Sequence, residues 1–249
     1  MPNARSHLRL LAALLTTTAA ACLTTAASAA AQAVATATPA TAGGKPTKLR
    51  WAVDGTVPPV AGRIPKALVM TAPGFTLDRR AIAKRCRKAQ ATLDECPKRS
   101  KIGTALMTIL VTRPNGTVNP LGIEITLYQG SKTTVFAVIF LVGNRVVPGK
   151  LESTADGIAL TFDPLPTPPA IPQVSYAFKD VSANLGVTRK VIKRVKVNGR
   201  KRRKRRTVRY SLVRTPADCA AGSWAATATL TFPDTTSALL AAPIACTAP

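Results

Sequence analysis

Residues 101–142 read KIGTALMTILVTRPNGTVNPLGIEITLYQGSKTTVFAVIFLV, and this stretch decides the fold class. Its three apolar runs are Lys101–Thr112, Leu121–Gln129 and Thr133–Val142, and segments rich in Gly, Pro, Asn and Ser separate them. Apolar runs of this length between turn-forming segments are typical of β-strands. The most apolar part, Val135–Val142, is too short to cross a bilayer, so it is predicted to be a buried strand.

The chain from Leu49 onward repeats this pattern of short apolar runs and turns. Many short strands at this spacing predict an all-β fold, an antiparallel β-sandwich with one short helix, built as one unit or as two small β-subdomains. The other predicted strands are Arg50–Val53, Ala67–Thr71, Val146–Glu152, Ile158–Phe162, Val174–Asn184, Val187–Val197, Thr207–Arg214, Ser223–Phe232 and Ser237–Cys246.

One segment has helical rather than strand periodicity. Ile82, Cys86, Ala89 and Leu93 recur three or four residues apart, and Asp78 can cap the start of a helix. The sequence therefore predicts a short helix that begins after Asp78 and ends at Leu93.

Composition also predicts how the chain is divided. Residues 30–47 are rich in Ala, Thr, Pro and Gly, which is typical of a flexible leader. The sequence PLPTPPAIP at 164–172 cannot form a central strand, because proline lacks the N–H that a sheet requires. It is predicted to be a stiff connector between a first β-rich part, 48–163, and a second, 173–249, which carries a basic hairpin. A crossing between the sheets of one sandwich is the alternative.

The N-terminal residues 1–29 have the features of a secretory signal peptide. Arg5 and Arg9 give a positive start, Leu10–Leu15 is a short apolar run, and Ala27-Ser28-Ala29 fits the cleavage pattern of small residues. The sequence therefore predicts a secreted, extracellular or cell-envelope protein, with no transmembrane segment after signal removal.

Cleavage is expected after Ala29, with Ala31 and Ala33 as alternative sites. A lipoprotein anchored through Cys22 is a further alternative, although the alanines before this cysteine lack the larger aliphatic residue typical of such sites. Either way, the only histidine, His7, leaves with the signal.

Four cysteines remain in the exported chain, and an even number favours disulfides. Four cysteines allow three pairings. Cys86–Cys96 with Cys219–Cys246 is the preferred pairing, because each bond then closes a local loop. The tight CxxC pairs of a zinc site are absent from the sequence, so neither a metal nor another cofactor is expected.

Two blocks of sequence resemble a known group of proteins. The first is APGFTLDRRAIAKRC followed by CPKRSKIGTA, and the second is LVRTPADCAAGSWAATATLTFPDTTSALLAAPIAC. Together they resemble uncharacterised secreted, β-rich proteins of high-GC actinobacteria, over residues 64–246. The resemblance implies an envelope or extracellular location and paired cysteines, and it implies no activity. The matching positions are Pro73, Gly74, Phe75, Cys86, Cys96, Pro97, Ser100, Ile102, Gly103, Ala105, Pro216, Cys219, Trp224, Phe232 and Cys246.

The inventory of reactive side chains argues against an enzyme. Without a histidine, the exported chain cannot build a Ser-His-Asp triad, a Cys-His pair or a histidine-metal site. Nine of the eleven acids stand alone in the sequence, so a glycan-acting enzyme built on paired carboxylates is the remaining catalytic alternative. Trp51, Trp224, Tyr128, Tyr176 and Tyr210 lie in strand patterns and are predicted to be core residues rather than a carbohydrate platform.

The sequence KVNGRKRRKRRTVRY, residues 196–210, contains seven consecutive basic residues in a chain whose formal net charge is +24. An Asn198-Gly199 turn favours a type I′ hairpin, whose register would place Val187 opposite Tyr210. That pairing seats the base of the hairpin in the core and opposes like charges near the tip. Each such pair is expected to destabilise the ladder by up to roughly 1 kcal/mol.

This hairpin is the candidate binding site. It could neutralise wall phosphate, an acidic glycan, anionic lipid or nucleic acid, without sequence-specific base reading because no aromatic residue is interleaved with the charges. The protein is therefore predicted to have a non-catalytic structural or interaction role, with polyanion binding as the alternative. A second cluster, Arg79–Lys88 with Lys98, Arg99 and Lys101, would extend the patch if it faces the same way. The candidate residues are Arg189, Lys190, Lys193, Arg194, Lys196, Arg200, Lys201, Arg202, Arg203, Lys204, Arg205, Arg206 and Arg209.

Overall fold

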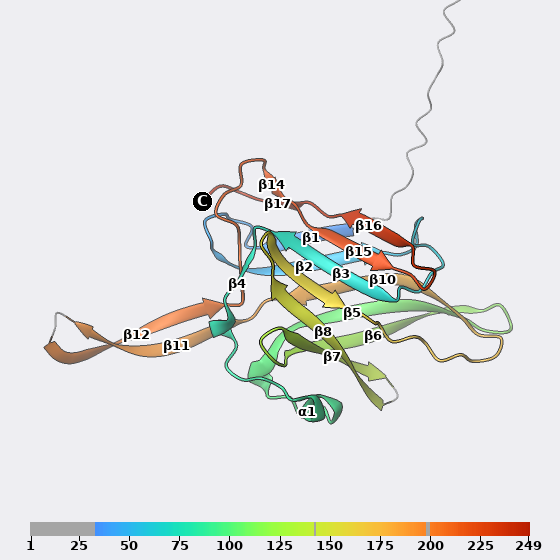
Figure 1. The fold of residues 1–249 in the computed structure, drawn as a ribbon, viewed down its shortest axis with the longest axis horizontal. Helices are drawn as coiled ribbons and strands as arrows, with labels where there is room; N and C mark the ends of the chain where they lie inside the picture. The colour runs from blue at the N-terminus through green and yellow to red at the C-terminus, as the bar shows by residue number, and fades with distance from the viewer. Residues whose placement is uncertain (1–32, 142, 198–199) are drawn as a thin grey trace, which may run out of the picture.

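A computed structural model describes residues 33–141, 143–197 and 200–249, which form an almost all-β protein (Figure 1). Thirteen strands are hydrogen-bonded into one antiparallel sheet. Its order is β16 (Ser237–Ala241), β15 (Thr227–Thr231), β3 (Ala67–Pro73), β9 (Gly157–Phe162), β8 (Gly143–Ser153), β7 (Thr134–Leu141), β6 (Val118–Gln129), β5 (Lys101–Thr112), β10 (Ser175–Leu185), β2 (Pro46–Asp54), β13 (Val213–Arg214) and β4 (Thr76–Leu77), with β1 (Ala33–Thr38) paired to β2.

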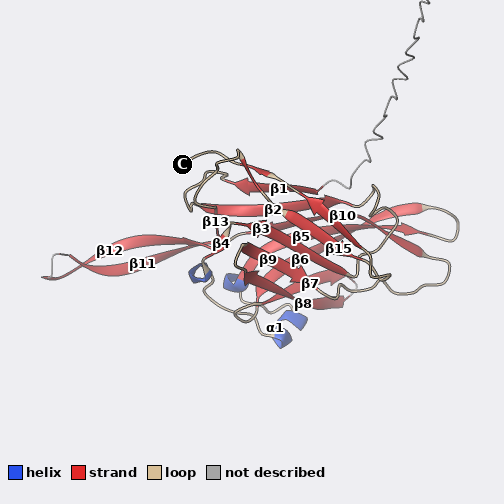
Figure 2. Cartoon of the chain, turned by 45° about the horizontal axis from the view of Figure 1, so that its top comes forward, coloured by secondary structure: helices blue, strands red, loops and turns tan. Residues whose placement is uncertain are grey.

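Two short ladders complete the described strands. They are β11 (Thr188–Val197) with β12 (Arg200–Ser211), and β14 (Ser223–Trp224) with β17 (Ile244–Ala245). The predicted all-β, antiparallel fold is confirmed. A sandwich of two separate sheets is not confirmed, because the main strands are hydrogen-bonded into one continuous sheet (Figure 2). Each of the three predicted strands that end the chain is divided between two observed strands.

The strands form because apolar residues alternate with polar ones, and successive side chains of a strand point to opposite faces. In β2, Leu49, Trp51 and Val53 are buried, while Lys48 and Arg50, on either side of Leu49, are exposed. The apolar faces of the strands meet in one hydrophobic core, to which nearly every strand of the sheet contributes.

The first strand corrects the prediction for residues 30–47. A flexible leader is wrong for Ala33–Thr38, which pair with β2 as β1 and bury Ala35 and Ala37. Beyond it, the Ala42 N–H donates to the Thr247 carbonyl at 2.9 Å, so the C-terminal segment packs beside the N-terminal strands. Alanine and threonine suggested a leader because small side chains carry little burial signal. The predicted signal peptide lies outside the described residues.

The Pro-rich connector, residues 164–172, joins β9 to β10 without separating two sheets. β10 pairs with β2 and β5, and β15 pairs with β3, so strands from both sides of the connector alternate. The parts 48–163 and 173–249 therefore share one sheet and one core.

The predicted helix is much shorter than expected. The described helical segments here are a single 3-10 turn, η1 (Arg79–Ala81), and α1 (Lys88–Thr92). Asp78 does cap the first turn, since its side chain accepts a hydrogen bond from the Arg80 N–H. Between the two segments the chain is extended, and the Cys86 N–H donates to the Gln129 carbonyl at 2.8 Å. Contact with the end of β6 thus overrides the helical spacing.

The hairpin of β11 and β12 forms with a different register from the predicted one. A register shift between Lys196 and Val197 places Tyr210 opposite Arg189, whereas a regular ladder would place it opposite Val187. An Asn-Gly pair locates a turn, but it carries no information about an irregularity in the strand beside it.

Candidate anion-binding site

The hairpin of residues 188–211, called here the cationic hairpin, projects away from the main sheet (Figures 1 and 2). Its root is seated in the protein, since Tyr210 is buried and Val191 and Val208 pack against the core. Lys190 and Arg209 at the root are exposed. The hairpin therefore joins the core at its base.

Most predicted binding residues belong to the outer part of the hairpin. The structure describes only the backbone pairing of Lys193, Arg194, Lys196 and Arg200–Arg206. Asn198 and Gly199 lie outside the described residues. The backbone register sets Arg194 opposite Arg205, so like charges are opposed along the ladder as predicted, although in different pairs. Arg189, the remaining candidate, is half-buried.

An open groove of about 660 Å³ lies at the root of the hairpin and is called here the root groove. Gly186 and Val187, the residues directly before β11, form part of its wall. Four cationic side chains line it, and no acid does among the described residues. They are Lys48, Arg50, Lys98 and Lys101.

Three elements supply these four cations. Lys48 and Arg50 lie on the exposed face of β2, because the intervening Leu49 is fully buried. Lys98 belongs to the 3-10 turn η2 (Lys98–Ser100), and Lys101 is the first residue of β5. All four are exposed.

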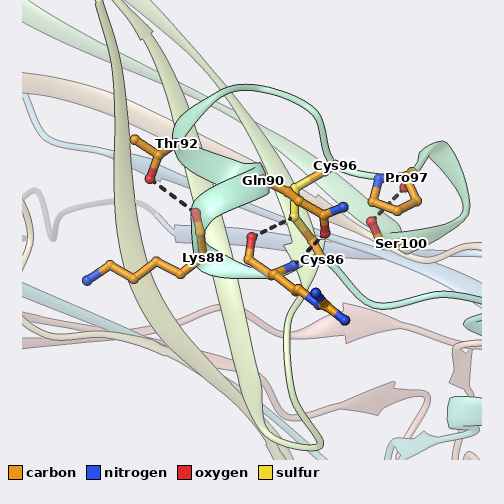
Figure 3. Close-up of a disulfide and its surroundings, with 8 residues drawn as sticks. Cys86, Lys88, Gln90, Thr92, Cys96, Pro97 and Ser100 are labelled. Atoms are coloured by element: carbon orange, nitrogen blue, oxygen red, sulfur yellow. Dashed lines mark hydrogen bonds between the residues drawn. A yellow bond between two sulfur atoms is a disulfide. The ribbon is translucent and has the colours of Figure 1, made fainter.

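The segment that carries Lys98 and Lys101 is held in place by a disulfide and a short hydrogen bond. Figure 3 shows the Cys86–Cys96 bond and the Ser100 hydroxyl, which donates to the Pro97 carbonyl at 2.6 Å. The buried Ile102 follows. A second bond joins Cys219 to Cys246, so the predicted pairing of the four cysteines is confirmed.

A close approach of two strands shapes the floor of the root groove. At Gly103 a Cβ atom would lie only 2.1 Å from the Asn184 carbonyl oxygen of β10, so no larger residue fits without a backbone shift. Ser100, Ile102 and Gly103 of the CPKRSKIG block thus have a structural role, because they fix the position of Lys98 and Lys101.

A second cationic pocket, of about 380 Å³, lies beside η1, which packs against β12. Its wall contains Arg79, Lys84, Arg85 and Lys132. The Arg79 guanidinium donates to the Leu151 carbonyl at 2.7 Å. Burial lowers the pKa of Arg79, and the nearby positive charge of Arg85 lowers it further. An anion in this pocket would relieve that repulsion.

One acid beside the hairpin root, Asp78, is already paired with arginine. Asp78 is 8% exposed and accepts two hydrogen bonds from the Arg80 guanidinium, at 2.7 and 2.8 Å, with Arg214 3.8 Å away. The hydrogen bond from Arg80 lowers the pKa of Asp78 more than burial raises it. Arg80 also lies over the Tyr210 ring, 4.8 Å from its centre. This pair therefore anchors η1 to β12 and leaves little negative charge near the groove.

Two further carboxylates face each other across the sheet. Asp54 and Asp180 are opposed across β2 and β10, but neither lines a described cavity. Hydrogen bonds from Thr56 lower the pKa of Asp54, which is the wrong direction for a general acid. Within residues 33–141, 143–197 and 200–249, no three His, Cys, Asp or Glu side chains gather closely enough to hold a metal.

The large aromatic residues have mostly structural positions. Trp51, Trp224 and Tyr210 are buried, and Tyr128 and Tyr176 are half-buried. Phe75 of the first resembling block packs edge-on against Trp224 of the second, with ring centres 5.2 Å apart. The two blocks thus contact each other in the core.

The structure brings part of the second predicted cluster to the hairpin. Lys98 and Lys101 line the root groove, whereas Arg87, Lys88 and Arg99 are exposed and line neither cationic pocket. Lys48, Arg50 and Lys132 could not be identified as site residues from the sequence, because isolated cations give no signal until the sheet order is known. That order is what places β2 beside β10.

In the described part of the chain, no helix is long and apolar enough to cross a membrane. Comparison with known proteins finds no family model, no curated protein and no solved structure that matches the chain.

Proposed function

We propose that this chain is a non-catalytic, exported or envelope-associated protein that binds an anionic polymer at its hairpin end. The observation that carries the proposal is the root groove, where Lys48, Arg50, Lys98 and Lys101 converge without an acid beside the first residues of β11. Three separate segments of the chain, namely β2, residues 98–101 and the hairpin, contribute to one positive surface. A basic loop that was merely solvated would not need cations from other segments beside it.

The charge distribution indicates how the surface would work. The 13 basic residues between Arg189 and Arg209 extend from the groove, so a long polyanion could lie in the groove and along the hairpin together. Phosphate or sulfate groups would be neutralised in succession, with release of counterions. Such contacts recognise charge density rather than sequence, and wall phosphate, acidic glycan, anionic lipid and nucleic acid are the candidate classes.

Export is part of the same proposal. Two disulfides are stable in oxidising compartments and rare in the cytosol of most organisms. The test is the mass of the protein from the culture medium and envelope of its producing cells. A product that begins at Ala30 supports the proposal, and an unprocessed, reduced protein recovered only from the cytosol contradicts it.

Binding is tested by titrating the oxidised protein against fluorescein-labelled heparin and a labelled single-stranded oligonucleotide between 50 and 200 mM salt. If about six charges engage the oligonucleotide, the slope of log K against log salt is about −4, a loss of about 300-fold over this range. A polymer from the cell wall competing for heparin would then identify the source of the charge.

Two variants separate site binding from net charge. Replacement of Arg200–Arg206 by Gly and Ser removes seven of the 13 hairpin charges, and the triple variant K48Q/R50Q/K101Q removes three groove charges. The matched control is K66Q/R113Q/K150Q, which removes three cations that do not line the groove. The groove and hairpin variants should each weaken binding at least tenfold more than the control. Equal losses in groove and control variants, or binding unchanged in the hairpin variant, would contradict the proposed site.

A further inference from the structure

An apolar cavity lies beneath the Pro-rich connector, at the end of β10 remote from the hairpin. It has a volume of about 290 Å³, and Pro168 and Pro169 of the connector form part of its wall. Its wall contains Met107, Ile109, Ile123, Ile139, Leu165 and Phe178. A smaller cavity of about 40 Å³, called here the inner extension, shares part of this wall, including Met107, Ile139 and Phe178.

The sequence explains why the core is not closed here. Ala105, Ala137 and Ala183 supply small side chains to the wall of the inner extension, on three different strands of the sheet. The roof is the connector, whose prolines fix the backbone dihedral φ and therefore resist collapse onto the sheet. Protein interiors are normally packed without voids much larger than a water molecule. A cavity of this size is close to the lower end of the range of small-molecule sites, about 300–1,000 Å³.

The mouth of the cavity is charged on one side. Arg145 is the charged residue of its wall, it is exposed, and it lies directly opposite Ile139 across β7 and β8. No acid lines the cavity, and none of the ion pairs found among the described residues involves Arg145. Thr167 and Tyr176 add polar groups to the wall. An apolar interior therefore meets a positive charge at the mouth.

We propose that this cavity binds an amphipathic ligand with a single hydrocarbon chain and an anionic headgroup. The chain would lie between Met107, Ile123 and Phe178, where it removes apolar surface from water. The headgroup would remain at the mouth, where the Arg145 guanidinium can hydrogen-bond a carboxylate or phosphate. The site is separate from the root groove and does not depend on polymer binding there.

The proposal is tested by calorimetric titration of the full-length oxidised protein with decanoate, dodecanoate and tetradecanoate, each below its micelle concentration. Binding should be saturable at one site, and affinity should increase about fourfold for each added methylene until the cavity is filled. Dodecanol should bind more weakly than dodecanoate. R145A should weaken dodecanoate binding by about fivefold without affecting dodecanol, and R145K should preserve it.

Two substitutions on neighbouring positions of β5 test the location. Met107 lines the cavity, whereas Leu106 points to the other face and is 44% exposed, so M107W should abolish binding and L106W should not. I109F is a second filling variant if M107W folds poorly, and a thermal melt establishes that each variant is folded. Replacement of Arg200–Arg206 by Gly and Ser should leave fatty-acid binding unchanged, which separates this site from the proposed polymer site.

Absence of saturable binding by the unsubstituted protein for all three acids would overturn the proposal. Equal binding by M107W, I109F and the unsubstituted protein would also overturn it, since the ligand would then lie elsewhere. If R145A lost nothing relative to R145K, the anionic headgroup would be refuted and the ligand would be a neutral chain.

Discussion

Removing the Cys219–Cys246 disulfide by the double substitution C219A/C246A should destabilise the protein more than removing the other bond. The two cysteines are 27 residues apart, and Cys86 and Cys96 are 10 apart. The entropy of closing these loops in the unfolded chain gives about 3.5 kcal/mol for the longer one and about 2.7 kcal/mol for the shorter one. Because a domain of this size loses about 2–4 °C per kcal/mol, the melting temperature of C219A/C246A should decrease by about 7–14 °C.

The location of the longer loop adds a second expectation. The Cys246 N–H donates to the Gly222 carbonyl at 3.0 Å, and the next residue, Thr247, pairs with Ala40 and Ala42. Freeing Cys246 should therefore loosen the contact between the chain ends before the centre of the sheet. Hydrogen exchange should show reduced protection of the Ala42 and Thr247 amides, with little change in β6 and β7.

Urea unfolding of oxidised protein, with C86A/C96A as the comparison, measures the free-energy changes. A loss below about 1 kcal/mol for C219A/C246A, or a clearly larger loss for C86A/C96A, would refute reasoning from loop length. The second outcome would mean that packing around Cys86, which is 3% exposed, dominates over chain entropy.

Two further predictions concern single residues near the hairpin root. G103A should destabilise the protein by about 1–3 kcal/mol in urea unfolding, because the new Cβ atom would meet the Asn184 carbonyl oxygen; G122A is the control, where the nearest atom would be 3.9 Å away. A normal stability for G103A would show that β5 and β10 can separate freely. D78N should cost about 1.5–3 kcal/mol at neutral pH, because charge-assisted hydrogen bonds from Arg80 are lost. The pKa of Asp78 is lower in the folded protein than in the unfolded chain. Its contribution to stability is therefore fully present above about pH 3.9 and is lost as the pH falls through the folded pKa. The difference in stability between D78N and the unsubstituted protein should vanish only in strong acid. A difference that disappeared near pH 6 would contradict the assignment.

Local pattern was sufficient to predict most strands but not how they are assembled. Lys101–Thr112 was predicted with its observed bounds, because apolar runs and turn residues are local signals. The order of strands was not accessible, since β2 pairs with β10 and β13, which lie far away in the sequence. The short α1 was overestimated because periodicity over residues 78–93 cannot show that Cys86 is held against Gln129.

The candidate sites also differ in how far the sequence could predict them. The cationic hairpin was evident from a run of charge, and both disulfides from loop closure. The root groove was not, because Lys48 and Lys98 are brought together only by the pairing of β2, β10 and β5. The apolar cavity was also missed: Ala105, Ala137 and Met107 are ordinary strand residues in the sequence, and only the volume between them distinguishes them.

The long-range pairing of the outer strands also sets the order in which the chain can complete its fold. β3 needs β15, and the Thr71 and Thr227 hydroxyls that meet at 2.7 Å are 156 positions apart. A polypeptide that emerges from its N-terminus through a narrow pore would hold β2 without β13 and β3 without β15 until most of the chain has passed. Threading in an extended state and folding at the destination is therefore the kinetic regime that this topology suits, and rapid folding during synthesis is the one that it disfavours.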